Sequence, residues 1–440
     1  MLNKKSDLPR GSKKLIRAWT FYDWANSVYS LVISSAIFPI YYSTHVFSDI
    51  NSILIFNIDI NKDTLISLLS GLCFLIIAFL SPMLSGIADY IGNKKIFMKF
   101  FVYMGSFSCM SLYWFELENI EISLLLYFFS LLGFWGSLVY YNSYLNDITF
   151  PKQANSVSAK GYTMGYIGSV ILLLINLIMI YFFEDLGFDS DKSAMKLSFA
   201  LTGLWWLGFS QYSFYYLPGR KHYNIKKSNL YSIETFLSGF NQLVDVLKQL
   251  KVNRKLRIFL FSFFIFTIPT QTIILLASYF GADLDEIGWK DAESMQTGLI
   301  LAIIVIQILA AAGAYLSAKL SDIFGNIRTL IGINILWGII CFYGYFVTTP
   351  TEFYIAAGFI GLGMGGIQSL SRSTYSKLID VKYSTSYFSF YDVSQKLSIV
   401  LGTALYATMD VFTGSIRLAI LIFALFFIPS IFLLKQISKR

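Results

Sequence analysis

The residues of this sequence that could do chemistry are a few polar side chains inside long apolar segments. Asp23 and Asn26 stand in the first such segment, and Asp392 and Lys396 stand one helical turn apart in a late one. A charged side chain within a membrane-spanning helix must face protein or a water-filled cavity, so it is a functional candidate. We expect these groups to bind a solute or to relay an ion; in the alternative interpretation the charges only neutralise each other or neighbouring helices. The candidates of this kind are Tyr22, Asp23, Asn26, Asn142, Gln368, Arg372, Asp392 and Lys396.

The parts of the common enzyme sites are missing from the same segments. The two histidines, His45 and His222, fall outside the apolar runs, so no intramembrane histidine can act as a general base. Cys73, Cys109 and Cys341 stand far apart inside apolar runs, which predicts core thiols and neither a disulfide framework nor a metal site. The sequence contains no glycine-rich loop ending in Gly-Lys-Ser or Gly-Lys-Thr that would bind ATP phosphates. We therefore expect a protein that is not an enzyme and that uses no cofactor.

The elements that position these side chains are long apolar runs. Hydrophobic residues make up 56% of the 440 residues and charged residues only 14%, whereas soluble globular chains carry roughly a quarter charged residues. This composition excludes a soluble protein, and each run has the length of about 20 residues that a helix needs to cross a bilayer. Twelve spans are predicted, at about 17–42, 64–91, 96–115, 122–146, 159–183, 194–217, 255–281, 295–321, 328–348, 352–377, 385–410 and 414–434.

The basic residues are distributed unequally between the two sides of these spans. The net charge of +8 could suggest nucleic acid, but Lys and Arg number about 27 in the tails and even-numbered turns and only 5 on the other side. Because cytoplasmic loops carry the excess of Lys and Arg, both termini are predicted to be cytoplasmic. The basic surface is thus explained by the lipid bilayer, and we expect no nucleic-acid partner.

A short polar turn between the second and third spans returns later in the chain. It reads Gly86-Ile-Ala-Asp89-Tyr-Ile-Gly92-Asn-Lys94-Lys95, and its echo reads Ser321-Asp322-Ile-Phe-Gly325-Asn-Ile-Arg328. Gly86 allows close helix contact and Gly92 can take a positive φ. The two lysines supply positive charge at a membrane face. Because one turn recurs at matching spacing, we expect two copies of one unit.

Two further features concern packing and the connection between the copies. Glycines at helical spacing between Gly358 and Gly366 predict close helix contacts. We place the N-terminal half at 1–217, a cytoplasmic linker at 218–254 and the C-terminal half at 255–440. In the linker, apolar residues recur at intervals of three and four and predict an amphipathic helix on the inner membrane surface. They are Ile233, Phe236, Leu237, Phe240, Leu243, Val244 and Leu247.

With the turn motif and its echo, twelve spans in two halves resemble the major facilitator superfamily. Within it the chain resembles the vacuole-effluxer family, on the segments Tyr22-Asp-Trp-Ala-Asn-Ser27, Tyr141-Asn-Ser-Tyr-Leu-Asn-Asp147, Gly161-Tyr162, Gly165-Tyr166, Gly168 and Gly365-Gly-Ile-Gln-Ser-Leu-Ser-Arg-Ser373. The resemblance implies an all-α membrane protein whose first, fourth, seventh and tenth helices line a cavity. By this analogy Gln271, beside the kink expected at Pro269, joins the candidates.

The function predicted on these grounds is gradient-driven transport of a small solute by alternating access. The family resemblance implies export, with neutral amino acids as the favoured class. The alternatives are a transporter of another metabolite or drug-like solute, or a solute receptor on the same fold that does not transport. We expect a monomer in the cell inner membrane, and a proton or another ion as the coupling partner.

Overall fold

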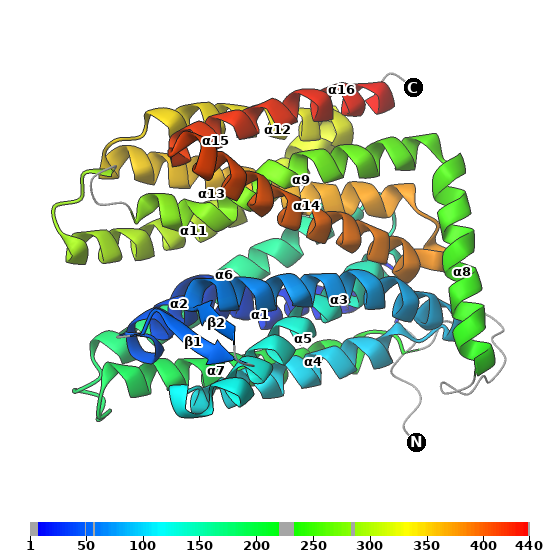
Figure 1. Ribbon diagram of the computed structural model, residues 1–440. Coiled ribbons are helices and arrows are strands. Elements are labelled where there is room, and N and C mark those ends of the chain that lie inside the picture. The colour runs from blue at the N-terminus through cyan, green and yellow to red at the C-terminus, as the bar shows by residue number, and fades with distance from the viewer. Residues whose placement is uncertain (1–7, 49, 56–57, 220–232, 283–286, 439–440) are drawn as a thin grey trace. The chain divides into compact units, whose positions relative to one another are not determined.

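The computed structural model describes residues 8–48, 50–55, 58–219, 233–282 and 287–438, and these are predominantly helical (Figure 1). The predicted linker residues 220–232, which include His222, lie outside the described residues. The elements up to the linker are α1 (Lys13–Tyr29), η1 (Ser30–Ala36), α2 (Ile37–Tyr41), η2 (Tyr42–Val46), β1 (Ser52–Ile55), β2 (Ile58–Asn61), α3 (Lys62–Ile91), α4 (Lys94–Ser111), η3 (Leu112–Trp114), η4 (Leu117–Asn119), α5 (Ile120–Ile148), α6 (Ala154–Tyr181) and α7 (Asp191–Tyr216). The later elements are α8 (Ile233–Val252), α9 (Arg254–Gly281), α11 (Ala292–Phe324), α12 (Asn326–Phe346), α13 (Pro350–Leu378), η5 (Val381–Tyr383), α14 (Ser384–Thr413), α15 (Ile416–Phe423), η6 (Ala424–Phe426) and α16 (Phe427–Ser438).

Every predicted span coincides with helical structure. Within the described residues, nine helical segments are long and apolar enough to cross a membrane. The other three predicted runs lie on α1 with its continuation through η1 and α2, on α7, and on α14. The all-α prediction is confirmed apart from one small hairpin, in which β1 pairs antiparallel with β2 in the connection before α3. Twelve crossings and cytoplasmic termini stay predictions.

The ends of several helices follow from local sequence. Ser190, Asp291 and Thr349 each form a capping box with the residue three positions later, and Pro350 occupies the first turn of α13. Such caps satisfy backbone N–H groups that have no partner within the helix. At the other end, Gly92 closes α3 with φ 65°, as expected for a left-handed residue in the turn motif.

The described chain divides into two compact units. One contains residues 1–142 and 168–240, and the other contains 143–167 and 241–440. The end of α5 and the first half of α6 therefore pack with the C-terminal helices, although they precede the linker in sequence. Helices α5 and α6 are each shared between the two units.

Glycines bring α11 and α13 into backbone contact, as predicted from their spacing. A Cβ on Gly365 would overlap the carbonyl oxygen of Ala310, and one on Gly361 would lie 2.5 Å from the carbonyl oxygen of Ile306. A Cβ on Gly313 of α11 would in turn overlap the carbonyl of Leu362. Small residues at such positions let helix backbones approach closely in a membrane protein. The two helices therefore form one tightly packed pair.

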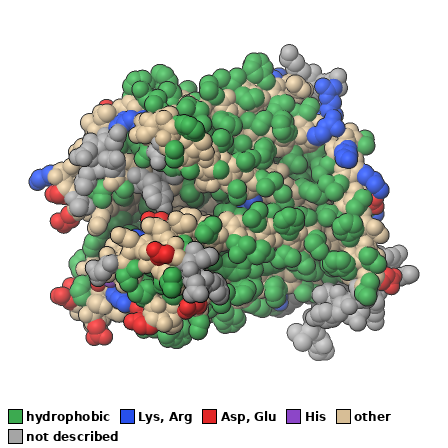
Figure 2. Space-filling view, in the orientation of Figure 1, with side chains coloured by type: hydrophobic (Ala, Val, Ile, Leu, Met, Phe, Trp, Pro, Cys, Tyr) green, Lys and Arg blue, Asp and Glu red, His purple; other side chains and the backbone are tan. Residues whose placement is uncertain are grey.

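The surface is consistent with a membrane environment. Figure 2 shows hydrophobic side chains over most of the visible face, with Lys, Arg, Asp and Glu gathered near helix ends. Large apolar side chains point outward along the spans, as Phe79, Phe107 and Phe342 illustrate with 75%, 55% and 59% exposure. The three cysteines, predicted as core thiols, are all buried.

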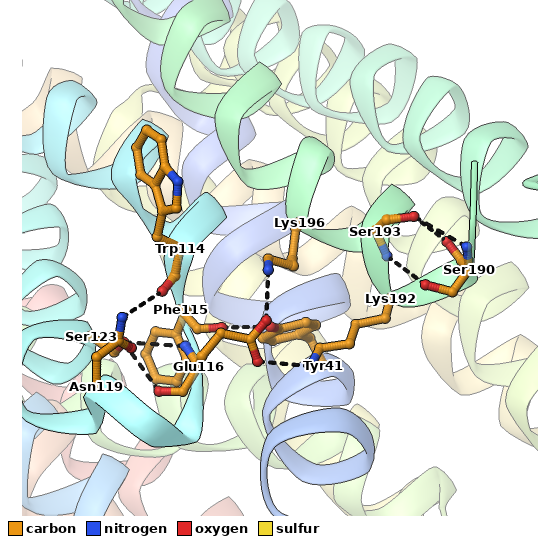
Figure 3. Close-up of polar contacts among 10 residues, drawn as sticks. All are labelled: Tyr41, Trp114, Phe115, Glu116, Asn119, Ser123, Ser190, Lys192, Ser193 and Lys196. Atoms are coloured by element: carbon orange, nitrogen blue, oxygen red, sulfur yellow. Dashed lines mark hydrogen bonds and ion pairs between the residues drawn. The ribbon is translucent and has the colours of Figure 1, made fainter. Parts of the chain in front are cut away.

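Glu116 forms two ion pairs within the unit that contains residues 1–142 and 168–240 (Figure 3). The Glu116 carboxylate lies 2.7 Å from Nζ of Lys192 and 2.6 Å from Nζ of Lys196, which tie the connection before α5 to α7. Tyr41 donates to the neighbouring carbonyl of Phe115 at 2.6 Å. Partial burial alone would raise the pKa of Glu116, but the two lysines outweigh it and hold the pKa below its usual range.

This depressed pKa predicts a stability contribution that is lost in acid. A carboxylate with a lowered folded-state pKa stabilises the protein above its unfolded pKa of about 4.3, and the contribution disappears as pH falls through the folded-state value. Because the group is partly exposed, we expect roughly 0.5–1 kcal/mol. Melting temperatures between pH 7 and pH 3 should show Glu116→Gln below the parent at neutral pH and level with it in acid. Glu118→Gln, at an exposed neighbour, is the matched control; equal curves for all three proteins would contradict the prediction.

Candidate functional site

The predicted acid of the first span is buried against α5. Asp23 is 4% exposed, and its Oδ2 accepts a hydrogen bond of 2.5 Å from the hydroxyl of Tyr141. Trp19 stacks on Tyr141 at 4.6 Å between ring centroids and donates from Nε1 to the Tyr141 carbonyl at 2.9 Å. One tyrosine thus receives contacts from two successive turns of α1. The carboxylate is held in place by Tyr141, which the sequence analysis quotes for the family resemblance but does not name as a candidate.

The neighbouring candidates on α1 belong to the same network. Tyr22 is fully buried and donates to Oγ of Ser137 on α5 at 2.8 Å. Asn26 is also buried, and its Nδ2 has no hydrogen-bond partner among the described residues. A buried polar atom without a hydrogen-bond partner costs free energy. Asn142, half-buried, follows Tyr141 on α5.

The acid and base of α14 form the local pair that their spacing predicts. Lys396 Nζ lies 2.9 Å from Oδ1 of Asp392, and the side chains are 1% and 6% exposed. The other carboxylate oxygen, Oδ2, has no hydrogen-bond partner among the described residues. The pair is therefore buried but incompletely satisfied on its acidic side.

Gln271, a further candidate in the C-terminal unit, lies away from this pair. Ser398 of α14 donates to the carbonyl of Phe264, and a Cβ on Gly402 would meet Ile268 and Thr272, so α9 and α14 run in the same direction. Lys396 precedes Gly402 by six residues, which is roughly 9 Å along a helix. Gln271, half-buried beside Thr272, thus stands well beyond Lys396 along the shared axis.

Arg372 of α13 is buried against the first half of α6. Its guanidinium lies 4.0 Å from the ring centroid of Tyr162, Nε donates to Oγ of Ser158 at 3.0 Å, and one terminal nitrogen donates to the Ser158 carbonyl at 2.9 Å. Stacking on an aromatic ring and a fixed fork of donors are the interactions for which arginine is suited. The predicted intramembrane arginine is therefore part of a specific helix contact.

Further contacts extend this polar seam, by which we mean the hydrogen bonds from residues 143–167 to α11, α12 and α13. The hydroxyl of Tyr166 donates to Oε1 of Gln368 at 2.9 Å. At the opposite end, the amides of Asn155 and Asn326 bond to each other twice, each at 2.9 Å, and Asn155 also donates to Ser321 at 2.8 Å. Ser321 and Asn326 belong to the echo of the turn motif, so this turn holds the start of α6.

Sequence analysis missed most of the α6 side of the seam. Asn155, Ser158, Tyr162 and Tyr166 recur at three and four and so form one helix face. The polar spacing was a signal, but Tyr162 and Tyr166 were quoted only for the family resemblance, and Asn155 and Ser158 were not named. The structure brings Gln368 and Arg372 into one seam, pairs Asp392 with Lys396, and sets Tyr22 and Asp23 against Tyr141. Asn26 lies one turn further along α1.

The first copy of the turn motif makes different contacts. A Cβ on Gly86 would overlap the carbonyl oxygen of Gly239 in α8, so the close helix contact expected there is with the linker helix. Lys95 donates to the carbonyl of Leu217 at 2.7 Å, and Lys94 is only 5% exposed. Protein contacts thus enclose Lys94, and the positive charge that the two lysines supply at a membrane face stays a prediction.

The helical architecture, the paired turn motifs and the buried polar clusters define a multi-pass membrane transporter of the major facilitator type. Solved structures of this class superpose on most of the chain. The E. coli fucose:proton symporter has a TM-score of 0.68 at 15% identity, covering 96% of this chain and 97% of that one. The human organic anion transporter MFSD10 has a TM-score of 0.70 at 10% identity, covering 97% and 100%.

Sequence comparison shows the family to which this chain belongs. Residues 11–151 and 147–440 match the family described as vacuole effluxer Atg22 like, and the chain belongs to that family. It is 32% identical over 430 residues to the uncharacterized MFS-type transporter YxiO of Bacillus subtilis, covering 96% of this chain and 94% of that protein. Autophagy-related protein 22-1 of Penicillium rubens is 27% identical over 302 residues, and the match spans 63% of this chain but about half, 48%, of that relative.

Proposed function

We propose that the protein exports a small polar or amphipathic solute across the cytoplasmic membrane by alternating access, with neutral amino acids as the favoured class. The observation that carries the proposal is the polar seam, because most of its hydrogen bonds join groups that water can satisfy when the contact opens. Residues 143–167 bond to the C-terminal helices, while the remainder of α5 and α6 packs in the other unit. Any rearrangement of one unit against the other must break the seam or bend both helices.

The hydrogen bonds of the seam suit a contact that opens and closes during transport. Apart from the two bonds that the Arg372 guanidinium donates to Ser158, its bonds join neutral amides, hydroxyls and carbonyls, such as the Asn155–Asn326 pair and the Tyr166–Gln368 bond. Each neutral bond contributes about 1 kcal/mol, because water can replace either partner when the contact opens. Such a seam closes one side of a transporter without making closure irreversible. Rocking of two repeats around a central site is the motion that transporters of this architecture use.

Coupling to an ion gradient is assigned to the two buried acids. Oδ2 of Asp23 accepts the hydrogen bond from the Tyr141 hydroxyl, and Oδ2 of Asp392 has no hydrogen-bond partner among the described residues. A carboxylate that gains a proton loses its charge, which weakens its hold on a cationic or donor partner. We infer that proton uptake and release at these acids bias the transporter between its two states. The E. coli fucose:proton symporter among the structural neighbours supports a proton over other ions.

Solute counterflow in proteoliposomes tests the function. Vesicles are loaded with one unlabelled amino acid, sugar or nucleoside, and the entry of the same labelled solute is followed. Accumulation with one class identifies the substrate and establishes transport. No accumulation across the panel, in protein that elutes and melts as folded, contradicts the amino-acid proposal and favours a receptor that binds solute without moving it.

Asp23→Asn should reduce gradient-driven transport at least tenfold while leaving the fold intact. The amide keeps the shape of the side chain and can still bond to Tyr141, but it cannot take up a proton under the conditions of transport. The measurement is uptake driven by an imposed pH gradient, together with the melting temperature. Asp59→Asn, in the exposed strand β2, is the charge-matched control, and Tyr141→Phe tests the hydrogen bond alone. Normal transport by Asp23→Asn would remove this acid from the coupling mechanism.

A further inference from the structure

The linker helix α8 exposes an apolar strip that the described chain does not cover. The strip consists of Ile233, Phe236, Leu237, Phe240 and Leu247, which are 79%, 46%, 55%, 50% and 41% exposed. The spacing of three, four and seven places these side chains on one face of the helix. Leu243, a further residue of the predicted apolar face, is buried.

A second face of α8 holds it against the protein. Leu243, Val246 and Leu250 are buried, and the last two belong to the core of the C-terminal unit. The hydroxyl of Tyr387, at the start of α14, donates to Oε1 of Gln249 at 2.5 Å. In Figure 1, α8 lies across the ends of α9 and α14. These contacts fix the rotation of the helix, so the exposed strip has a defined direction.

The third face and the C-terminal end of α8 carry charge. Asn241, Asp245 and Lys248 are exposed on the polar face. From residue 241 to residue 257 the chain has five basic residues and one acidic residue; the basic ones are Lys248, Lys251, Arg254, Lys255 and Arg257. An apolar face beside a basic polar face is typical of helices that lie in a membrane interface.

We propose that the strip enters the headgroup region of the bilayer and that the basic residues beside it bind anionic phospholipids. The chain spans the membrane, and α8 leads into the spanning helix α9 after one residue, so bilayer is within reach of the strip. A second copy would bring the same basic residues against each other, since a two-fold interface pairs like surfaces. Anionic headgroups complement that charge. This inference does not depend on which solute is transported.

Site-specific fluorescence in nanodiscs tests the insertion of the strip. A cysteine is placed at Phe240 on the strip, or at Asp245 on the polar face as the matched control, and labelled with an environment-sensitive dye; the three native cysteines are buried. Nitroxide-labelled lipid should quench the dye at 240 several-fold more than the dye at 245, and aqueous iodide should do the opposite. Equal iodide quenching at both positions would overturn the proposal.

The lipid composition of the disc and the number of copies complete the test. Adding phosphatidylglycerol to phosphatidylcholine should increase lipid quenching at 240, and Lys248→Gln with Lys251→Gln should abolish that increase. An increase that survives both substitutions would overturn the assignment of these lysines to anionic lipid. If the dye at 240 is protected from iodide only in discs that hold two copies, a protein interface covers the strip, and the bilayer does not. Transport measured on the same samples reports separately on the proposed function.

Discussion

Replacing Lys396 with methionine is expected to abolish counterflow and to destabilise the protein. Methionine keeps the apolar bulk of the side chain but removes the Nζ donor that lies 2.9 Å from Oδ1 of Asp392. Breaking a buried ion pair by removing one partner costs about 3–5 kcal/mol, because the remaining charge stays desolvated. The measurements are the melting temperature in detergent and the counterflow rate. Lys290→Met, at an exposed position, is the control.

The double variant Asp392→Asn with Lys396→Met separates stability from function. With both charges removed, no uncompensated charge stays buried, so most of the lost melting temperature should return. Transport should not return, because the titratable group has gone. A double variant that transports at the parent rate would show that the pair only stabilises α14, and the coupling role would then rest on Asp23 alone.

Gly365→Ala is expected to disrupt the pair of helices α11 and α13. The added Cβ would overlap the carbonyl oxygen of Ala310 and would lie 2.9 Å from the backbone nitrogen of Ala314. Because both obstacles are backbone atoms, the helices must move apart. Overpacking costs about 1–3 kcal/mol or more, and we expect the upper part of this range. Gln368 and Arg372 lie one and two turns further along α13, so the polar seam would also be displaced.

Gly332→Ala is the matched control for this substitution. Gly332 also lies within a helix, α12, but a Cβ there would meet no atom within 4 Å. Alanine is a better helix former than glycine by about 0.5–1 kcal/mol, so this variant should melt at or above the parent temperature. Chromatography and melting curves in detergent compare the two proteins. If Gly365→Ala melts at the same temperature as Gly332→Ala, the result contradicts the backbone contact between α11 and α13 at Gly365.

Local features of this protein could be predicted from sequence because their physical causes are local. A run of about 20 apolar residues is sufficient to predict a span, since the bilayer sets the required length. Asp392 and Lys396 pair because residues four apart lie on one helix face. Gly92 takes a positive φ because the turn requires it and no Cβ opposes it.

Contacts between helices distant in sequence were decided only by the tertiary structure. Tyr141 donates to Asp23 across 118 positions, and Arg372 reaches Ser158 across 214. Such contacts depend on the rotation and depth of each helix, which are set by packing against its neighbours. The α8 strip shows the same limit: the 3.6-residue period predicted an apolar face, but burial of Leu243 and Val246 decided which part of it faces the protein. The sequence by itself thus determined the apolar helices, the turn at Gly92 and the pair of Asp392 with Lys396, whereas the hydrogen bonds between α6 and helices α11, α12 and α13 required the folded chain.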